Sequence, residues 1–269
     1  MIVALVCAAS FALYVLLVRR HDAKLPRRRW PLVRSVWCGL GLALFAGALS
    51  PAFDTAADRA FGLHMLQHVL LTFGVAPLLL SSAPLLLVLA TAPPGIARPL
   101  ARALHGPVGR VLFFPPLGWL AFVGFFWASH FSGLYENALR NESVHVCEHV
   151  VYLATALLFW WPILAVPPTP WLLGYPARLL YVFLTIPQNA FLSLSIFSAR
   201  HVLYPTYGAL GVADALAGQR AAGALMWVVG GLGMLVTVLA LGMGWVHDER
   251  ARTLRENTRL DASAGAVIA

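Results

Sequence analysis

Long apolar runs limit what this chain can fold into more than any other feature of the sequence. The run over residues 61–92 is apolar enough to cross a lipid bilayer, which takes about 20 residues of helix. Across the chain, 60% of the residues are hydrophobic and 11% are charged, with a mean hydropathy of +0.77. Soluble domains do not have this composition, and the alternation typical of a membrane β-barrel is missing from the sequence. We therefore predict an all-α integral membrane protein.

The apolar runs predict a bundle of seven transmembrane helices. They fall at about 2–18, 32–50, 63–80, 111–130, 145–165, 177–198 and 221–246. Pro77 should kink the third helix, and the Ser-Ser-Ala-Pro segment at 81–84 should interrupt it, so that 85–92 extends the helix or lies at the interface. The fifth helix should finish in an interfacial aromatic belt at 159–161. We expect one seven-span domain over 1–247 and a charged cytoplasmic tail over 248–269.

Basic residues are unevenly divided between the two sides of this predicted bundle. If the loop after the first helix is cytoplasmic, the other side holds only four of the 19 Lys and Arg residues, namely Arg59, Arg140, Arg200 and Arg220. The positive-inside rule then places the N-terminus outside and the C-terminus in the cytoplasm. Basic cytoplasmic loops also explain the net charge of +8, so no nucleic-acid partner is predicted. The first run lacks a preceding basic segment and an A-x-A cleavage site, so we expect a span rather than a removed signal.

Six of the nine histidines fall at the outer ends of four predicted helices. They are His64, His68, His130, His145, His149 and His201. The pairs 64/68 and 145/149 are spaced i,i+4, which places each pair on one face of a helix. Ionisable side chains inside membranes are costly and usually serve a function. The pattern predicts that these imidazoles share a pocket just beneath the outer water interface.

The two paired motifs also suggest an internal repeat. H-x-x-Gln-H at 64–68 is followed by His130 and Tyr135, and H-x-x-Glu-H at 145–149 by His201 and Tyr204. A duplicated helix pair would place the two motifs side by side.

Neutral imidazole ligates zinc, copper, iron and nickel. Copper is favoured because it heads the divalent affinity order and because Cu(I) also accepts sulfur ligands. Met65, Cys147 and Met226 could supply sulfur, although core packing is the ordinary role of such residues. Gln67 and Glu148 could orient the imidazoles, or Glu148 could bind the metal directly. Zinc is the alternative metal.

Three other functions fit parts of the pattern. The sequence HVCEH at 145–149 matches the inverted zinc-protease motif, but its third ligand would have to be Asp214, and the copy at 64–68 has Gln where the base is needed. Haem could bind one histidine from each of two facing helices, but this does not explain why each motif carries two histidines spaced i,i+4. A copper permease needs polar residues along its path, for which the candidates are Thr185, Gln188, Asn189, Ser193 and Ser195.

Three segments of the chain resemble the polytopic CtaG family, the assembly factors of caa-type cytochrome c oxidases. They are HMLQHVLLTFGVAPLLLSSAP at 64–84, the run from Trp127 to Leu164, and GQRAAGALMWVVGG at 218–231. The resemblance implies a multi-span protein that matures the oxidase by handling copper. The matching motif positions are His64, His68, His130, His145 and His149, with Met226 and Trp227. Family members often carry an acidic residue near the start of the last segment, where this chain has Gln219.

We therefore expect a non-enzymatic oxidase assembly factor in a bacterial-type cytoplasmic membrane, with a copper site facing the outer, periplasmic side. The expected partners are membrane lipid, an oxidase subunit, a soluble copper chaperone and a second copy of the chain. The alternative is a copper importer that uses the cluster for uptake, followed by a haem protein or a zinc hydrolase. The expected metal ligands are His64, His68, His130, His145 and His149, with His201, Glu148, Cys147, Met65 and Met226 as further contributors.

Overall fold

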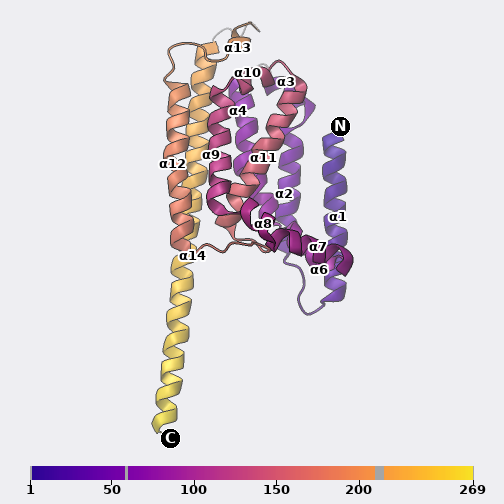
Figure 1. Ribbon diagram of the computed structural model, residues 1–269, viewed down its shortest axis with the longest axis vertical. Coiled ribbons are helices and arrows are strands. Elements are labelled where there is room, and N and C mark those ends of the chain that lie inside the picture. Colours follow the sequence, from indigo (N-terminus) through magenta and orange to yellow (C-terminus); the bar gives the residue numbers. More distant parts are fainter. Residues whose placement is uncertain (1, 58–59, 210–214, 269) are drawn as a thin grey trace.

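A computed structural model of the chain describes residues 2–57, 60–209 and 215–268. These residues fold into helices joined by turns, with no strand among them (Figure 1). The prediction of an all-α protein is therefore confirmed for the part of the chain that the structure describes. Most helices stand side by side as a bundle, and the last one extends far beyond the others (Figure 1).

The elements follow one another along the chain in the order of the colours in Figure 1. The first half contains α1 (Ile2–Lys24), α2 (Leu32–Ala48), α3 (Pro51–Ala57), α4 (Phe61–Val69), a π-helical segment η1 (Leu70–Val75), α5 (Ala76–Ser81), α6 (Pro84–Thr91), α7 (Pro94–His105) and α8 (Pro107–Leu112). The second half contains α9 (Pro115–Phe131), α10 (Leu134–Ala138), α11 (Glu142–Leu164), α12 (Tyr175–Phe197), α13 (Pro205–Ala209) and α14 (Ala215–Ile268).

Five of the described helices are long and apolar enough to cross a membrane. They are α1, the stretch Phe61–Thr91 that takes in α4 to α6, α11, α12 and α14. A sixth candidate is α2 together with α3, which are bent by 52° at the break between them. The span expected over 111–130 corresponds to α9, which is 17 residues long. These helices support a multi-pass membrane protein, while the count of seven and the orientation in the membrane stay predictions.

The bundle has two distinct ends. Figure 1 shows α3, α10 and α13 at one end, together with the first residues of α1. Because α4 and α11 begin at this end, and α9 and α12 finish there, we call it the histidine end. Figure 1 shows α7 and α8 at the opposite end, which we call the far end; α12 begins there and α14 projects beyond it.

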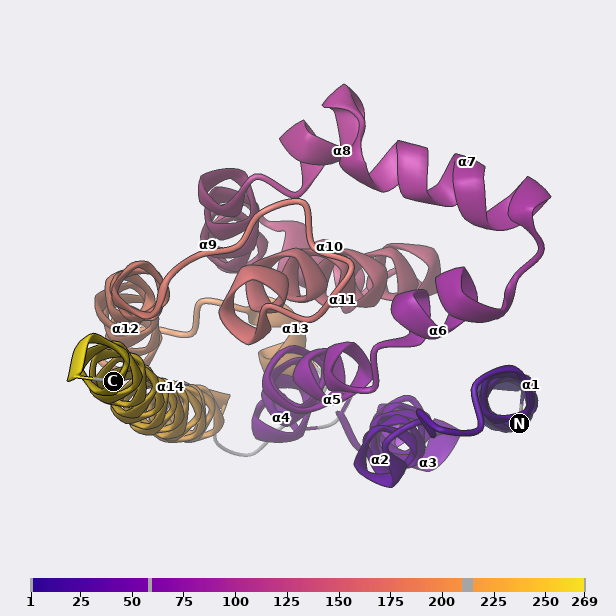
Figure 2. The ribbon, with the colours of Figure 1, turned by 90° about the horizontal axis from the view of Figure 1, so that it is seen from below.

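α1 stands at the margin of the bundle, beside α2 and α6 (Figure 2). The Tyr14 hydroxyl donates to the Ser82 carbonyl at 2.8 Å and accepts the indole N–H of Trp30 at 2.9 Å. Ser82 lies at the break between α5 and α6, where Ala83 takes a left-handed φ of +51°. The interruption expected at 81–84 is therefore present, and α1 bonds to one of its carbonyl groups.

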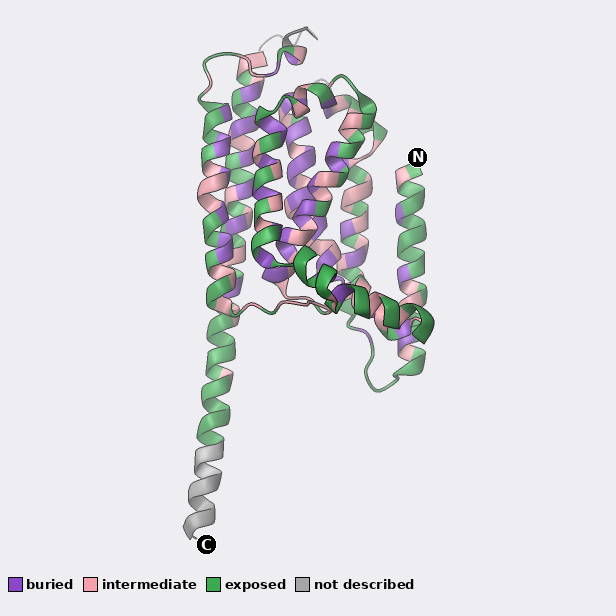
Figure 3. Cartoon of the chain, viewed as in Figure 1, coloured by how far each residue is buried: buried purple, intermediate pink, exposed green. Residues whose placement is uncertain are grey.

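Burial is concentrated on the faces that the central helices turn toward one another (Figure 3). α12 and α14 approach closely because glycines line their contact. A Cβ atom on Gly223 would lie 2.8 Å from the backbone nitrogen of Phe197, and one on Gly230 would lie 2.8 Å from Asn189 Oδ1. Close approach at small residues is how membrane helices gain packing energy without a hydrophobic driving force.

A π-helical turn explains how the helix of the first histidine motif accommodates Pro77. At the end of η1 the Ala76 N–H bonds to the Leu71 carbonyl, five residues back instead of four. The same spacing would pair the Thr72 carbonyl with residue 77, but proline has no N–H to donate. The indole N–H of Trp160 on α11 donates to that carbonyl instead, at 2.7 Å. The feature at Pro77 is therefore a π-turn whose freed carbonyl bonds to a neighbouring helix.

Two segments expected to be loops contain helices. Residues 93–110 form α7 and part of α8, and residues 131–144 contain α10. α7 is amphipathic, since Leu104 is buried while Arg98 and Arg102 are exposed. The number of charged residues by itself indicates a loop. Their spacing, which places them on one face, indicates an amphipathic helix.

Two of the three aromatic residues expected in an interfacial belt at 159–161 lie inside the protein. Phe159 and Trp160 are 0% and 4% exposed and belong to the main hydrophobic core. The physical reason is the bond from Trp160 to the π-turn, which gives the indole N–H a partner inside the protein and removes its need for water.

The charged tail continues the last helix. α14 runs unbroken from Ala215 to Ile268, so no change of secondary structure separates residues 1–247 from 248–269. Exposed charged residues mark the segment beyond the bundle, among them Glu249 and Arg252, whose charged groups lie 3.8 Å apart. The division into domain and tail stays a prediction that rests on charge.

Replacing Trp160 with Phe should lower the free energy of unfolding by about 1–3 kcal/mol, because the buried Thr72 carbonyl loses its donor. Adding Pro77→Ala restores an N–H at the π-turn, so the double variant should recover part of this loss. Trp161→Phe is the control, since its indole bonds to the partly buried Val166 carbonyl. Unfolding in detergent, followed by circular dichroism, measures all three. Equal losses in the single and double variants would contradict the assigned pairing.

Candidate metal centre

Two helices bring four histidines together at the histidine end. α4 carries His64 and His68, and α11 carries His145 and His149, each pair one turn apart. One ligand atom from each of the four residues lies within 4.8 Å of all the others. Between the helices, the ring centroids of His64 and His145 are 4.8 Å apart, and those of His68 and His149 are 5.3 Å apart. The two motifs therefore face each other across the contact between α4 and α11.

The N-cap of α11 fixes where the second motif lies. The side-chain oxygen of Asn141 accepts the backbone N–H groups of Ser143 at 3.0 Å and of Val144 at 3.3 Å. Such a cap satisfies the free N–H groups of the first turn and defines the start of the helix. His145 is therefore held in the first turn and His149 in the second.

Gln67 anchors α4 and does not orient the imidazoles. Its side-chain Nε2 donates to the Ala48 carbonyl at 2.7 Å and to Asp54 Oδ1 at 2.6 Å. These bonds tie α4 to the end of α2 and to α3. The interpretation of Gln67 as a hydrogen-bond partner of His64 or His68 is therefore wrong, because no described residue bonds to their ring nitrogens and its Nε2 is engaged by α2 and α3.

The imidazoles of His64 and His68 are buried without the hydrogen bonds that buried rings normally make. His64 and His68 are 0% and 1% exposed, and no described residue bonds to any of their four ring nitrogens. The Nε2 atom of His149 has no such partner either. A buried polar atom left unpaired costs about 1–3 kcal/mol. A ligand that accepts the lone pairs of these rings would remove that cost.

The donor set fits a transition-metal ion. Four imidazole nitrogens suit copper, zinc or nickel, and by themselves do not distinguish among these metals. In a tetrahedral site with bonds of about 2.0–2.1 Å, the ligand nitrogens lie about 3.4 Å apart. The four ligand atoms lie within 4.8 Å of one another, so small side-chain rotations would complete such a site.

Glu148 adds a carboxylate beside the four histidines. It is 2% exposed, and its Oε2 lies 3.9 Å from Nε2 of His68. Neither carboxylate oxygen has a hydrogen-bond partner among the described residues. A bound cation would offset the cost of burying this group. Glu148 therefore lies beside the cluster, and its contribution as a ligand stays a prediction.

Tyrosine rings enclose the histidines on two sides. The ring centroid of Tyr152, on α11, lies 4.3 Å from that of His68. The ring of Tyr135, on α10, lies 4.7 Å from that of His64. The Tyr152 hydroxyl is held by a 2.6 Å hydrogen bond to the Ser129 hydroxyl. These walls exclude water and restrict the rotation of the two imidazoles.

Tyr135 belongs to a group that we call the tyrosine lid, made of Phe61, Tyr135, Tyr204 and Tyr207. The rings of Tyr135 and Tyr204 are 4.6 Å apart, and the hydroxyl oxygens of Tyr135 and Tyr207 are 3.1 Å apart. Burial raises the pKa of the Tyr135 and Tyr204 phenols above its ordinary value, so both stay neutral. The lid brings together the two tyrosines that follow the motifs of the suggested repeat.

Polar contacts between α10 and α13 hold the tyrosine lid together. Glu136 accepts hydrogen bonds from the backbone N–H and the hydroxyl of Thr206, and from the guanidinium of Arg140. Arg140 also donates through Nε to the Thr206 hydroxyl at 3.0 Å. We call these three residues the latch. It joins the segment after α9 to the segment after α12.

His130 lies behind the lid and outside the group of four. Its Nδ1 donates to the Phe126 carbonyl at 2.8 Å, which leaves the lone pair on Nε2. Its ring stacks on Tyr135 with the centroids 6.0 Å apart and the planes 16° apart. The structure therefore places Tyr135 beside both His130 and His64 and does not bring His130 itself into the cluster.

Two predicted contributors point away from the cluster. His201 is exposed, and its backbone carbonyl accepts the side-chain amide of Gln219 at 3.3 Å. Cys147 is also exposed, on the face of α11 that carries the exposed Val146 and Val150. At about 100° per residue, position 147 is turned roughly 200° from position 145. The structure therefore does not bring these two side chains into the group of four.

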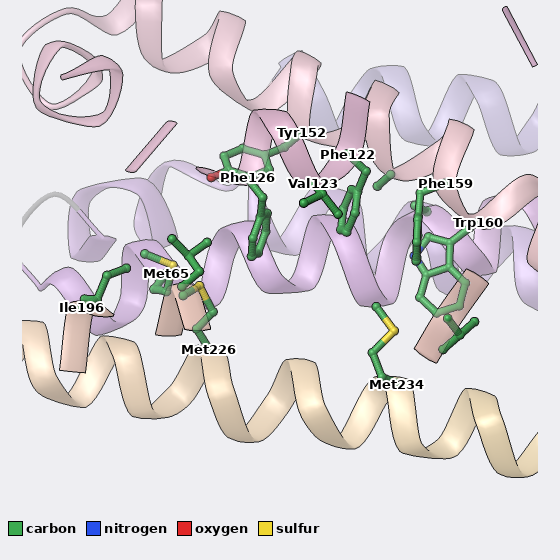
Figure 4. Packing of buried hydrophobic residues seen from close by; sticks show 14 of the residues in the cluster. Met65, Phe122, Val123, Phe126, Tyr152, Phe159, Trp160, Ile196, Met226 and Met234 are labelled. Atoms are coloured by element: carbon green, nitrogen blue, oxygen red, sulfur yellow. The ribbon is translucent and has the colours of Figure 1, made fainter. Parts of the chain in front are cut away.

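The two methionines pack in the hydrophobic core. Met65 and Met226 are 1% and 0% exposed, and Figure 4 shows them among apolar side chains between α4 and α14. Gln219, in the segment where the family often has an acidic residue, accepts the Leu203 N–H at 2.7 Å. Asp214, which the zinc-hydrolase interpretation needs, lies outside the described residues.

Access to the centre is easiest at His145. It is half-buried, whereas the other three histidines are buried. It lies one turn from Asn141 and Glu142, both exposed at the start of α11. A ligand would therefore approach the cluster from the histidine end.

The fold and the site define a polytopic helical membrane protein with a buried four-histidine centre at one end of its bundle. The family described as cytochrome c oxidase caa3 assembly factor (Caa3_CtaG) matches residues 12–248. The chain belongs to this family. The match confirms the resemblance inferred from three segments and extends it over most of the chain.

The chain is also similar to uncharacterized proteins of three mycobacteria. It is 24% identical to those of Mycobacterium bovis and Mycobacterium tuberculosis over 250 residues, or 88% of this chain, and 24% identical to that of Mycobacterium leprae over 245 residues, or 87% of it. The chain spans less than two-fifths of the length of these relatives, 38%, 38% and 37% respectively. No solved structure matches the chain.

Metal binding by the four histidines should stabilise the bundle. Cu(II) or Zn(II) at about 100 times its dissociation constant should raise the free energy of unfolding by about 2.7 kcal/mol. His64→Ala should abolish this gain, whereas His201→Ala should retain it because that side chain is exposed. Thermal unfolding of protein purified without an affinity tag measures the shift. An undiminished gain in His64→Ala would place the metal elsewhere.

Proposed function

We propose that this protein is a non-enzymatic cytochrome c oxidase assembly factor that holds copper at its histidine centre and hands it to an oxidase subunit. Membership of the assembly-factor family supports the role in oxidase maturation. The four clustered imidazoles support metal binding. Copper is the cargo because it binds nitrogen ligands more tightly than the neighbouring divalent metals and because an oxidase assembly factor serves a metalloenzyme.

One contrast between histidines of this chain carries the proposal. A histidine buried for structural reasons bonds to a protein acceptor, as His130 does to the Phe126 carbonyl. His64 and His68 are buried more deeply, yet no described residue bonds to their ring nitrogens. Their lone pairs are therefore available to a ligand that comes from outside the chain.

Transfer requires a way in and out for the ion. In this proposal copper enters and leaves past the half-buried His145, delivered by a soluble copper chaperone and received by an oxidase subunit on the outer side of the membrane. A partner that docks on α10 and α13 would meet the latch directly. The latch joins the exposed guanidinium of Arg140 to the half-buried carboxylate of Glu136, so a docking partner would contact Arg140 first.

Copper titration of the purified protein tests the first step. The wild type should bind copper in near-stoichiometric amount, measured by elemental analysis after removal of free metal. The double variant His64→Ala/His149→Ala should lose this copper, because half of the ligand set is removed. Cys147→Ser, which changes an exposed sulfur on the opposite helix face, should keep it. Unchanged binding in the double variant would refute the site.

A row of buried polar residues favours a second candidate, a copper permease. Tyr181, Thr185, Asn189 and Ser193 are spaced four residues apart along α12 and are all buried. Tyr181 Oη, Asn189 Oδ1 and Ser193 Oγ have no hydrogen-bond partner among the described residues. Of the other predicted stations, Gln188 is half-buried and Ser195 is exposed. Polar side chains along one helix face are what a permeation path requires.

Transport in liposomes separates the two candidates. An assembly factor should give no counterflow of labelled copper, because its cargo is exchanged on one side of the membrane. A permease should give counterflow that Asn189→Leu reduces, since this change replaces the buried amide in the middle of the row. Counterflow with this sensitivity would favour the permease over the assembly factor.

A further inference from the structure

A large apolar groove lies on the side of the bundle, away from the histidine centre. It has a volume of about 700 Å³ and lies between η1 with α5, the end of α11, the start of α12, and α14. Along α14 it extends from Val229 to Gly244, which is about 22 Å at the helical rise of 1.5 Å per residue. Gly233 and Gly244 present no side chain to it, which leaves it open.

A single charged side chain lies among the described residues that line the groove. This is Arg178, in the first turn of α12 at the far end of the bundle. Its Nε donates to the Leu173 carbonyl at 2.7 Å, and its guanidinium lies 5.1 Å from the ring centroid of Tyr175. No acceptor among the described residues engages its two terminal nitrogens. The side chain is thus held at the groove while part of its charge remains available.

The groove therefore combines two features that a phospholipid requires. Its apolar length matches a fatty acyl chain, and its cation lies at one end of that length. The same end of the bundle carries the exposed Arg98 and Arg102 of α7, so its surroundings also favour anions. Basic pockets between membrane helices are recognised sites for anionic lipid headgroups.

We propose that this groove binds an anionic phospholipid, with an acyl chain along α14 and the headgroup phosphate at Arg178. The groove offers about 700 Å³, which lies within the range of about 300–1,000 Å³ for small-molecule sites. The half-buried Arg178 at one end of this apolar length favours a ligand with an anionic head and an apolar tail.

Lipid binding to the purified full chain tests the proposal. Native mass spectrometry compares phosphatidylglycerol with phosphatidylcholine of the same acyl chains, and glycerol phosphate serves as the free headgroup. We expect phosphatidylglycerol to bind about tenfold more tightly than phosphatidylcholine, because a charge-assisted bond to phosphate is strengthened where the headgroup carries net negative charge. Glycerol phosphate should not bind measurably. Equal binding of the two lipids would overturn the assignment of the headgroup.

Two pairs of variants locate the lipid. Arg178→Gln should remove the preference for phosphatidylglycerol, whereas the control Arg98→Gln, on exposed α7, should keep it. Ala240→Trp fills the groove from an exposed position of α14 and should weaken both lipids, whereas Leu235→Trp, exposed on the same helix outside the groove, should weaken neither. Lipid binding unaffected by Ala240→Trp would refute the groove. Dimers of the wild type that Ala240→Trp dissociates would assign it to a second copy instead.

Discussion

The packing of α11 against η1 and α5, which continue the helix of α4, is the constraint on which the rest of the structure depends. Each helix carries two imidazoles one turn apart, and only their opposition produces a group of four. The bond from the Trp160 indole joins α11 to the Thr72 carbonyl of η1, which the π-turn and Pro77 leave free. A shift of one residue in the register of these helices would break this bond and move the two histidine pairs away from each other.

Burial of unpaired imidazoles has a cost that the surrounding structure must offset. Aromatic contacts from Tyr152 and Tyr135 and the anchoring of Gln67 to α2 and α3 hold the rings in place without bonding to their nitrogens. The proposed function treats this arrangement as preorganised for a metal ion. In the proposed function this is an advantage, because a carrier must bind copper firmly enough to hold it and still release it to its partner.

The two ends of the bundle are built for different surroundings. The histidine end carries the cluster, the tyrosine lid and the latch, which joins α10 to α13 through Glu136 and Thr206. The far end carries the amphipathic α7 and the arginine of the lipid groove, Arg178. A site for metal exchange and a site for lipid can therefore coexist without sharing a residue.

By itself the sequence determined the helical membrane class, the i,i+4 pairing at 64/68 and 145/149, and the family, because hydropathy and helical periodicity are local properties. It did not determine which side chains meet. Only the tertiary structure separated His201 from the cluster, placed Tyr135 beside it, and assigned Gln67 to α2 and α3. Helical periodicity alone turns Cys147 away from His145. Tyr152 lies seven residues after His145 and therefore on the same face of α11. Of the two tyrosines that pack against the histidines, it is the one that helical periodicity could have found. The others depend on contacts between helices distant in sequence, which no local pattern encodes.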